Sequence, residues 1–251
     1  MADDTNVNVP VLIVGAGPCG LALAIELGRQ GIECQVAEEG DGSVDFPTTN
    51  LVSVRTAEHL RRWGLVDRIR HAGFPPDFPR RYLFVTRVGG RELARFEHPA
   101  NGAPDARSPH SPEGRIWCPK TFLDPVLHEH AGSLAPVSVR YGTRVEGITQ
   151  HAHGVTAELV DVATGRREET TAAYLVGCDG GVSPMRHHLG IELEGNFAQG
   201  QNVAIHFLCP TLLQVSEPAV MYNCVNPDAL GTLVAVDGKD RVYVFNRGEH
   251  P

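Results

Sequence analysis

The chain has 251 residues, 42% of them hydrophobic, and a formal net charge of −8 at pH 7, which suits a globular protein of one large or two modest domains. The negative charge and the lack of any basic run exclude a nucleic-acid or anionic-membrane surface. No stretch approaches the roughly 20 apolar residues of a membrane span, and residues 1–8 do not resemble a signal peptide, so we expect a cytoplasmic protein.

The first predicted element is a buried parallel strand at Val11–Val14, a short apolar run rich in β-branched residues. Gly15, Gly17 and Gly20 follow at G-x-G-x-x-G spacing. In that motif the first glycine permits a tight turn, the second lets a pyrophosphate approach the backbone, and the third lets helix and strand pack closely. A glycine-rich turn in an ordinary α/β protein is the alternative interpretation of this spacing alone.

The residues after the glycines complete a dinucleotide-binding pattern. Leu21–Arg29 have helical periodicity, Gly31 is a helix stop, and Ile32–Ala37 form a second predicted strand. Glu38 lies 18 positions after Gly20, where a carboxylate accepts hydrogen bonds from the ribose hydroxyls of an adenosine. Strand, helix, second strand and acid together predict a dinucleotide site.

A loop and two helices are predicted next. Residues 40–49 are rich in Gly, Asp, Ser and Pro, which is typical of an exposed loop, and residues 56–63 and 65–71 have helical patterns. Arg55 stands just before the first of these helices, where a cation could meet a phosphate or carboxylate. A solvated surface arginine is the alternative for this position taken alone.

The middle of the chain changes to strand periodicity. Residues 82–85 and 93–96 flank Gly89-Gly90 and predict a β-hairpin, and a long irregular segment follows at 98–114. Residues 121–131 are helical in pattern, and Pro125 is acceptable there only near the first turn.

Two further blocks of strands are predicted. The first is an antiparallel meander inserted between parallel strands, and it covers residues 138–141, 144–149, 155–161 and 168–172. The second is an antiparallel sheet beyond Gly190, and it covers residues 202–209, 218–225, 230–236 and 241–246.

Between these blocks lies a second strand-turn-helix pattern. Residues 173–178 predict another buried strand, which ends in Asp179-Gly180. Ser183 can cap a short helix that runs to Leu189. We interpret this segment as a second, smaller phosphate site.

Three segments together resemble the FAD-dependent aromatic hydroxylases, the single-component flavoprotein monooxygenases that include the para-hydroxybenzoate, phenol and polyketide hydroxylases. They are VLIVGAGPCGLALAIELGRQG with Glu38, NLVSVRTAEHLRRWGL at 50–65, and YLVGCDGGVSPMRHHLGI at 174–191, which is similar to the DG motif of that family. The resemblance implies an α/β fold with a Rossmann-like FAD-binding domain at 1–72 and 115–190. It also implies an antiparallel-sheet substrate domain at 73–114 and 191–251, incomplete at the C-terminus.

The same resemblance implies roles for individual residues. The pyrophosphate of FAD is expected at the glycine-rich loop, the adenosine ribose at Glu38, the flavin pyrophosphate or the nicotinamide cofactor near Arg55, and both cofactors at Asp179. Lys120 stands where the family often has a glutamine that reaches FAD. The full predicted set of cofactor contacts is Gly15, Gly17, Pro18, Cys19, Gly20, Glu38, Glu39, Arg55, Lys120, Asp179 and Gly180.

The family hydroxylates aromatic, phenolic or polyketide-type substrates with NAD(P)H and O2 through a flavin C4a-hydroperoxide, and the resemblance implies the same activity here. No catalytic base is identifiable. The family's third motif, GD, has no match between Gly181 and Pro251, because Asp237-Gly238 has the reverse order. The chain is therefore a fragment, one piece of a split enzyme completed by a second polypeptide, or a degenerate relative that serves as a non-catalytic nucleotide- or partner-binding module.

Neither a metal site nor a disulfide scaffold is predicted. The sequence has three pairs of adjacent or alternate histidines, among them His128 and His130. On a helix such pairs point to different faces, and no cluster of Cys or acidic residues completes a site. The six cysteines contain no C-x-x-C pair, so we interpret them as intracellular thiols.

Overall fold

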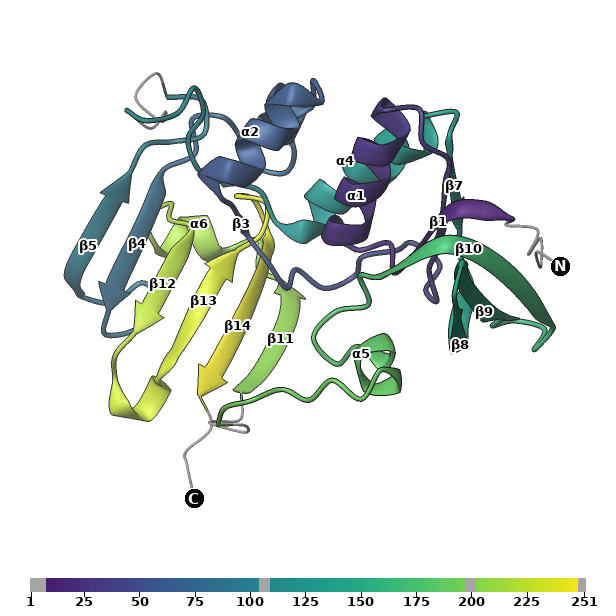
Figure 1. Ribbon diagram of the computed structural model, residues 1–251. Helices are drawn as coiled ribbons and strands as arrows, with labels where there is room; N and C mark the ends of the chain where they lie inside the picture. The colour runs from purple at the N-terminus through teal and green to yellow at the C-terminus, as the bar shows by residue number, and fades with distance from the viewer. Residues whose placement is uncertain (1–7, 104–108, 197–201, 248–251) are drawn as a thin grey trace, which may run out of the picture. The chain divides into compact units, whose positions relative to one another are not determined.

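The protein folds into two compact units, which are described here from a computed structural model (Figure 1). The structure describes residues 8–103, 109–196 and 202–247. Unit 1 consists of Met1–Ser43 and Asp124–Gly195, and unit 2 consists of Val44–Leu123 and Asn196–Pro251. Within the described residues, no helix is both long enough and apolar enough to cross a membrane. The absence of a signal peptide is predicted from residues 1–8, of which residues 1–7 lie outside the described residues.

Unit 1 is built on a six-stranded mixed sheet with the order β7-β2-β1-β10-β9-β8. Its strands are β1 (Val9–Val14), β2 (Cys34–Ala37), β7 (Val137–Arg140), β8 (Thr143–His151), β9 (Gly154–Asp161) and β10 (Arg167–Gly177). Its helices are α1 (Pro18–Arg29) and α5 (Pro184–His188), and helix α4 (Lys120–Gly132) crosses from unit 2 into unit 1. Helix α1 packs against the parallel strands β1, β2 and β7, which confirms the predicted Rossmann-like arrangement.

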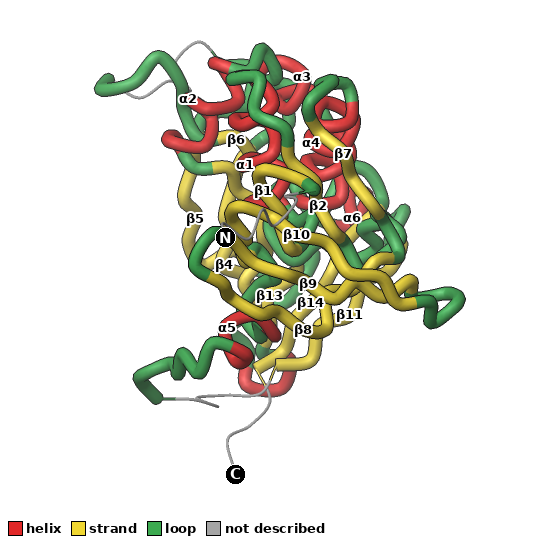
Figure 2. The backbone as a smooth tube through the Cα atoms, turned by 45° about the vertical axis from the view of Figure 1, so that its right-hand side comes forward, coloured by secondary structure: helices red, strands yellow, loops and turns green. Residues whose placement is uncertain are grey.

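One continuous strand joins the parallel and antiparallel parts of this sheet (Figure 2). The first part of β10 pairs antiparallel with β9, and its last part pairs parallel with β1. The predicted division into a strand at 168–172 and another at 173–178 is therefore wrong. No turn residue lies between Thr171 and Val176, so the chain has no local reason to break there.

Two further expectations for unit 1 are corrected. Strand β7 is not part of the meander, because it pairs parallel with β2 at the edge of the sheet. The strand at 173–178 is not fully buried, since the Tyr174 side chain is 70% exposed. Residues 173–177 pair with β1 alone among the described strands, so this half of β10 is less covered than a central parallel strand.

Unit 2 contains a second six-stranded sheet with the order β11-β14-β13-β12-β4-β5. Its strands are β4 (Arg80–Val85), β5 (Glu92–His98), β11 (Asn202–Leu208), β12 (Met221–Cys224), β13 (Gly231–Ala235) and β14 (Arg241–Arg247). The predicted hairpin is confirmed as β4 and β5. The sheet is not purely antiparallel as predicted, because β12 pairs parallel with β4, a strand more than a hundred residues earlier.

Short elements surround this sheet. They are β3 (Leu51–Val52), α2 (Val54–Arg62), α3 (Val66–His71), β6 (Ile116–Trp117), α6 (Leu212–Val215) and the 3-10 helix η2 (Pro227–Ala229). The hydroxyl of Ser53 caps α2 by accepting a hydrogen bond from the Thr56 N–H. Pro125 lies inside α4, beyond its first turn, so the expected restriction of this proline to the helix start is wrong.

The predicted functional domains and the compact units divide the chain at different places. Residues 44–72 and 115–123 were assigned to the FAD-binding part, whereas they belong to compact unit 2. These residues contain α2, α3, β3 and β6, which contact one another. The functional assignment of this stretch stays a prediction.

Candidate functional site

The turn after β1 is shaped by backbone crowding that only glycine tolerates. Gly15 has φ +100°, and a Cβ on it would lie 2.6 Å from the carbonyl oxygen of Cys178. Its N–H donates to the Ala37 carbonyl at 2.8 Å, which ties the turn to the end of β2. The chain at Gly15 therefore passes directly between two neighbouring strand ends.

The other two motif glycines differ sharply from each other. A Cβ on Gly20 would lie 1.9 Å from the Gly15 carbonyl oxygen, so this glycine lets α1 start against the turn. A Cβ on Gly17 would meet no atom within 4 Å. Gly17 is thus not needed for packing in the protein alone. Its bare backbone faces open space at the start of α1, which fits the approach of a phosphate group.

The first turn of α1 also suits an anion. Pro18 stands at the first helical positions, where its missing N–H costs nothing, and Cys19 beside it is exposed. The initial N–H groups of a helix have no partner within the helix and carry partial positive charge. Pro18 and Cys19 therefore leave this end of α1 accessible.

Glu38 lies at the end of β2, as predicted, and holds the glycine-rich loop. Its Oε2 accepts a hydrogen bond from the Ala16 N–H at 2.6 Å, and its Oε1 accepts one from the Gly40 N–H at 2.8 Å. Each carboxylate oxygen can accept a further bond, so ribose hydroxyls could still bind there. The next residue, Glu39, forms an ion pair with Arg144 at 3.1 Å.

A histidine that was not among the predicted cofactor contacts lies against the same loop, and a tyrosine contacts this histidine. The His128 imidazole lies 3.1 Å from the Ala16 carbonyl oxygen and 3.0 Å from the Tyr141 hydroxyl. Burial, followed by the negative charge of Glu38, raises the pKa of Tyr141, so its hydroxyl stays protonated at neutral pH. His128 is 112 residues from Ala16 in sequence, and no local pattern indicates the contact.

The turn after β10 is held by its own side chains. Asp179 Oδ1 accepts a hydrogen bond from the Ser183 hydroxyl at 2.7 Å, and Oδ2 accepts one from the Met185 N–H at 2.8 Å. Ser183 Oγ in turn accepts from the Arg186 N–H at 3.0 Å. The donors of α5 are therefore already used and a carboxylate stands among them, which argues against the second phosphate site predicted at this turn.

The two turns nevertheless touch each other. Gly15 lies against the Cys178 carbonyl, and the Cys178 N–H donates to the Val14 carbonyl at 2.7 Å. Burial raises the pKa of the Cys178 thiol, with smaller contributions from Cys19 and Asp179. Gly180 has φ +83°, and a Cβ on it would meet no atom within 4 Å. Asp179 and Gly180 thus lie next to the glycine-rich loop.

The remaining two predicted contacts belong to unit 2. Arg55 lies in the first turn of α2, is 75% exposed, and forms an ion pair with Glu58 at 2.7 Å. Lys120 is the first residue of α4, and its N–H donates to the Thr49 carbonyl at 2.8 Å. Their roles toward the cofactor stay predictions. Among the described residues, His, Cys, Asp and Glu side chains do not gather in a group of three or more that could hold a metal ion.

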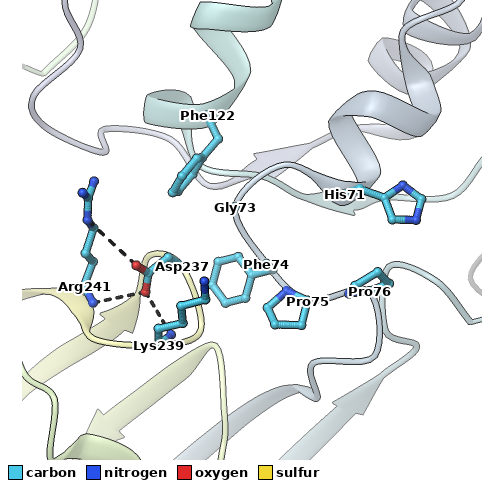
Figure 3. Close-up of a pocket in the computed structure, with 9 residues that line it drawn as sticks. All are labelled: His71, Gly73, Phe74, Pro75, Pro76, Phe122, Asp237, Lys239 and Arg241. Atoms are coloured by element: carbon cyan, nitrogen blue, oxygen red, sulfur yellow. Dashed lines mark hydrogen bonds and ion pairs between the residues drawn. The ribbon is translucent and has the colours of Figure 1, made fainter.

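Unit 2 contains a cavity of about 470 Å³ beside the turn between β13 and β14 (Figure 3). The rings of Phe74 and Phe122 line one part, and Lys239 and Arg241 line another. Asp237 between them is 8% exposed, and its Oδ1 accepts hydrogen bonds from the N–H groups of residues 239–241. The cavity thus combines aromatic faces with two cations, of which Arg241 forms an ion pair with Asp237 at 3.9 Å.

Comparisons with known proteins agree with this geometry. The family model described as "FAD binding domain" matches residues 8–250. The chain is 30% identical over 261 residues to the tetracenomycin B2 monooxygenase-dioxygenase of Streptomyces olivaceus, covering 96% of this chain and 47% of that protein.

Solved structures are also similar to this chain. The substrate-free rebeccamycin biosynthetic enzyme RebC has a TM-score of 0.88 and 32% identity, over 97% of this chain and 47% of RebC. Aklavinone-11 hydroxylase in complex with FAD and aklavinone has a TM-score of 0.85 and 29% identity, over 97% of this chain and 46% of that protein. The chain spans about half the length of the relatives it matches.

Proposed function

Because the chain belongs to the FAD binding domain family, we propose that it carries the adenosine and pyrophosphate end of the FAD site in an aromatic monooxygenase. The observation that supports this most is the loop at Gly17. There the backbone at the start of α1 is open to a ligand while the neighbouring glycines and Glu38 hold the loop in place.

The residues of unit 1 divide the cofactor between them. Gly15, Gly17, Pro18, Cys19 and Gly20 would hold the pyrophosphate, because the helix start offers backbone donors and no side chain that blocks them. The carboxylates of Glu38 and Glu39 would face the adenosine ribose. Asp179 with Gly180 would contact hydroxyl or amide groups of FAD and NAD(P)H. Arg55 and Lys120 belong to unit 2, and the positive charge that they would offer to the phosphates is proposed from the resemblance to the family alone.

Bound FAD would supply the redox chemistry, accepting two electrons from NAD(P)H and activating O2 for transfer of one oxygen atom to an aromatic ring. In the overall reaction, the ring carbon would exchange its hydrogen for a hydroxyl, the second oxygen atom would leave as water, and NAD(P)H together with one proton from solvent would be consumed to give NAD(P)+. The part of this chain is to bind and orient the cofactor through the residues named above.

The cavity of unit 2 is the proposed place for part of the substrate. Phe74 and Phe122 offer faces on which an aromatic ring can pack, and Lys239 and Arg241 can attract a phenolate or carboxylate substituent. A phenolic or polyketide-type substrate has both features. The proposal rests on the lining of the cavity and on the similarity of the chain to tetracenomycin B2 monooxygenase-dioxygenase and to the aklavinone-11 hydroxylase that binds aklavinone.

We further propose that the rest of the flavin site comes from polypeptide that corresponds to the second half of the relatives. The GD motif would lie in that half. The second half could follow in the same protein or come from a second chain. Co-purification of the chain with a protein encoded by a neighbouring gene distinguishes these sources.

The proposed function is tested by FAD binding and by turnover. The protein, alone or with the polypeptide equivalent to the second half, is expected to be yellow, to oxidise NAD(P)H faster when a phenolic compound is added, and to place one atom of 18O2 in the product. A protein that stays colourless and takes up no FAD under both conditions would instead be a non-catalytic module.

A further inference from the structure

A histidine and a tyrosine hold the carbonyl side of the glycine-rich loop within unit 1. His128 Nε2 lies 3.1 Å from the Ala16 carbonyl oxygen, and His128 Nδ1 lies 3.0 Å from the Tyr141 hydroxyl. A carbonyl oxygen only accepts, so Nε2 carries the proton and Nδ1 of the neutral ring accepts from the tyrosine. The hydrogen bonds therefore run in one direction, from Tyr141 through His128 to Ala16.

Ala16 is consequently fixed on both sides. Its N–H donates to Glu38 Oε2 at 2.6 Å, and its carbonyl accepts from His128. The peptide bond is planar and trans, so the Gly17 N–H points opposite to the Ala16 carbonyl. Fixing the Ala16 carbonyl therefore also fixes the direction of the Gly17 N–H. Gly17 is the motif glycine whose Cβ would meet no atom within 4 Å, so space for a ligand is left beside it.

We propose that His128, supported by Tyr141, is a positioning residue that presets the Gly17 N–H for the pyrophosphate of FAD. This inference rests on the proposed function of the loop. A donor that is already oriented loses less conformational freedom when the ligand binds, so it gives a higher affinity.

The surroundings of the pair support this role. Tyr141 packs beside Gly42, where a Cβ would lie 2.8 Å from the tyrosine ring, and the His128 and Tyr141 rings are 5.5 Å apart between centroids. Helix α4 has its own buried anchors at Val126, Leu127 and Ala131. The imidazole of His128 is therefore not required to attach the helix, and its hydrogen bond acts on the loop.

The test combines three variants with two measurements. The variants are His128→Ala, His128→Gln and Tyr141→Phe, and the control is His153→Ala, which removes an exposed histidine from the turn between β8 and β9. Hydrogen exchange by mass spectrometry on peptides that cover residues 15–21, measured without FAD, reports the order of the loop. A fluorescence titration with FAD gives the dissociation constant.

We expect His128→Ala to speed exchange in the loop and to weaken FAD binding about three- to tenfold, the effect of one lost hydrogen bond. His128→Gln should stay near wild type, because its amide can donate to Ala16 and accept from Tyr141. Tyr141→Phe should have a smaller effect alone and none in the His128→Ala background, since both act through one contact.

Loop exchange and FAD affinity unchanged in His128→Ala would overturn the inference. If His128→Ala does not fold, Tyr141→Phe decides between the outcomes. An unchanged FAD affinity in Tyr141→Phe overturns the inference, and a weaker FAD affinity that stabilising ligands do not restore supports it. A wild-type protein that binds no FAD would contradict the proposed function, whereas faster loop exchange in His128→Ala would still support the positioning by His128.

Discussion

Unit 1 contains two strand-turn-helix segments that start from adjacent strands of one sheet. The N–H groups at the start of the helix are open to a ligand in the first segment and are bound by side chains in the second. After β1 the turn is made by glycine backbone, and the start of α1 remains open at Gly17. After β10 the turn is closed by Asp179 and Ser183, whose oxygens accept the first N–H groups of α5. A similar pattern in sequence therefore produces one site for an anion and one turn that is already satisfied.

The difference follows from which group satisfies the helix N–H donors. A capping carboxylate removes those donors and adds negative charge, whereas a glycine-rich turn leaves them available. The two turns then suit different parts of one ligand. We expect phosphate at the first turn and hydroxyl or amide groups at the second.

The largest expected effect is from Gly20→Ala in the first turn. The new Cβ would lie 1.9 Å from the Gly15 carbonyl oxygen, and neither backbone can move without disturbing β1. We expect the free energy of unfolding to fall by about 3 kcal/mol or more, measured by urea denaturation of the FAD-free protein. Gly132→Ala is the control, because its Cβ would meet no atom within 4 Å. Equal stability of both variants would contradict the described turn.

A smaller effect is expected from Asp179→Ala in the second turn. Alanine has no side-chain oxygen to accept the Met185 N–H, so α5 loses one cap and the free energy of unfolding falls by about 1 kcal/mol. Hydrogen exchange of α5 amides should become faster while the loop at residues 15–21 keeps its protection. Unchanged exchange in α5, together with complete loss of FAD binding, would show that Asp179 serves the cofactor and not the helix.

The smallest effect concerns the two cysteines next to these turns. The raised pKa of Cys178 keeps its thiol protonated at pH 8, so iodoacetamide should modify the exposed Cys19 first. Raising the pH from 8 to 10 should keep increasing the rate at Cys178, and bound FAD should protect Cys19. Peptide mass spectrometry measures both rates. Faster labelling of Cys178 at pH 8 would contradict its burial.

The first turn could be predicted from sequence because its constraints are local. Gly15, Gly17 and Gly20 mark a strand-turn-helix, and Glu38 follows at the expected spacing. The resemblance to FAD-dependent aromatic hydroxylases is confirmed at the level of the family and the fold. The roles of the individual residues stay predictions.

What could not be predicted depends on contacts between distant residues or on side-chain orientation. The continuity of β10 is determined by its two neighbours, β9 and β1, which pair with different parts of it. The contact of His128 with Ala16 requires the packed position of α4. Asp179 has the same sequence spacing whether it turns toward a ligand or caps α5, so only the structure shows the cap.

The most direct test of the difference between the turns compares Gly17→Ala with Gly181→Ala. A Cβ at either position would meet no atom within 4 Å, so both variants should fold with wild-type stability. Titration with FAD is expected to show at least a roughly tenfold weaker affinity for Gly17→Ala, because the methyl group occupies the approach of the pyrophosphate. Gly181→Ala should bind FAD as the wild type does. Normal binding by Gly17→Ala and weak binding by Gly181→Ala would place the pyrophosphate at the second turn and contradict the account.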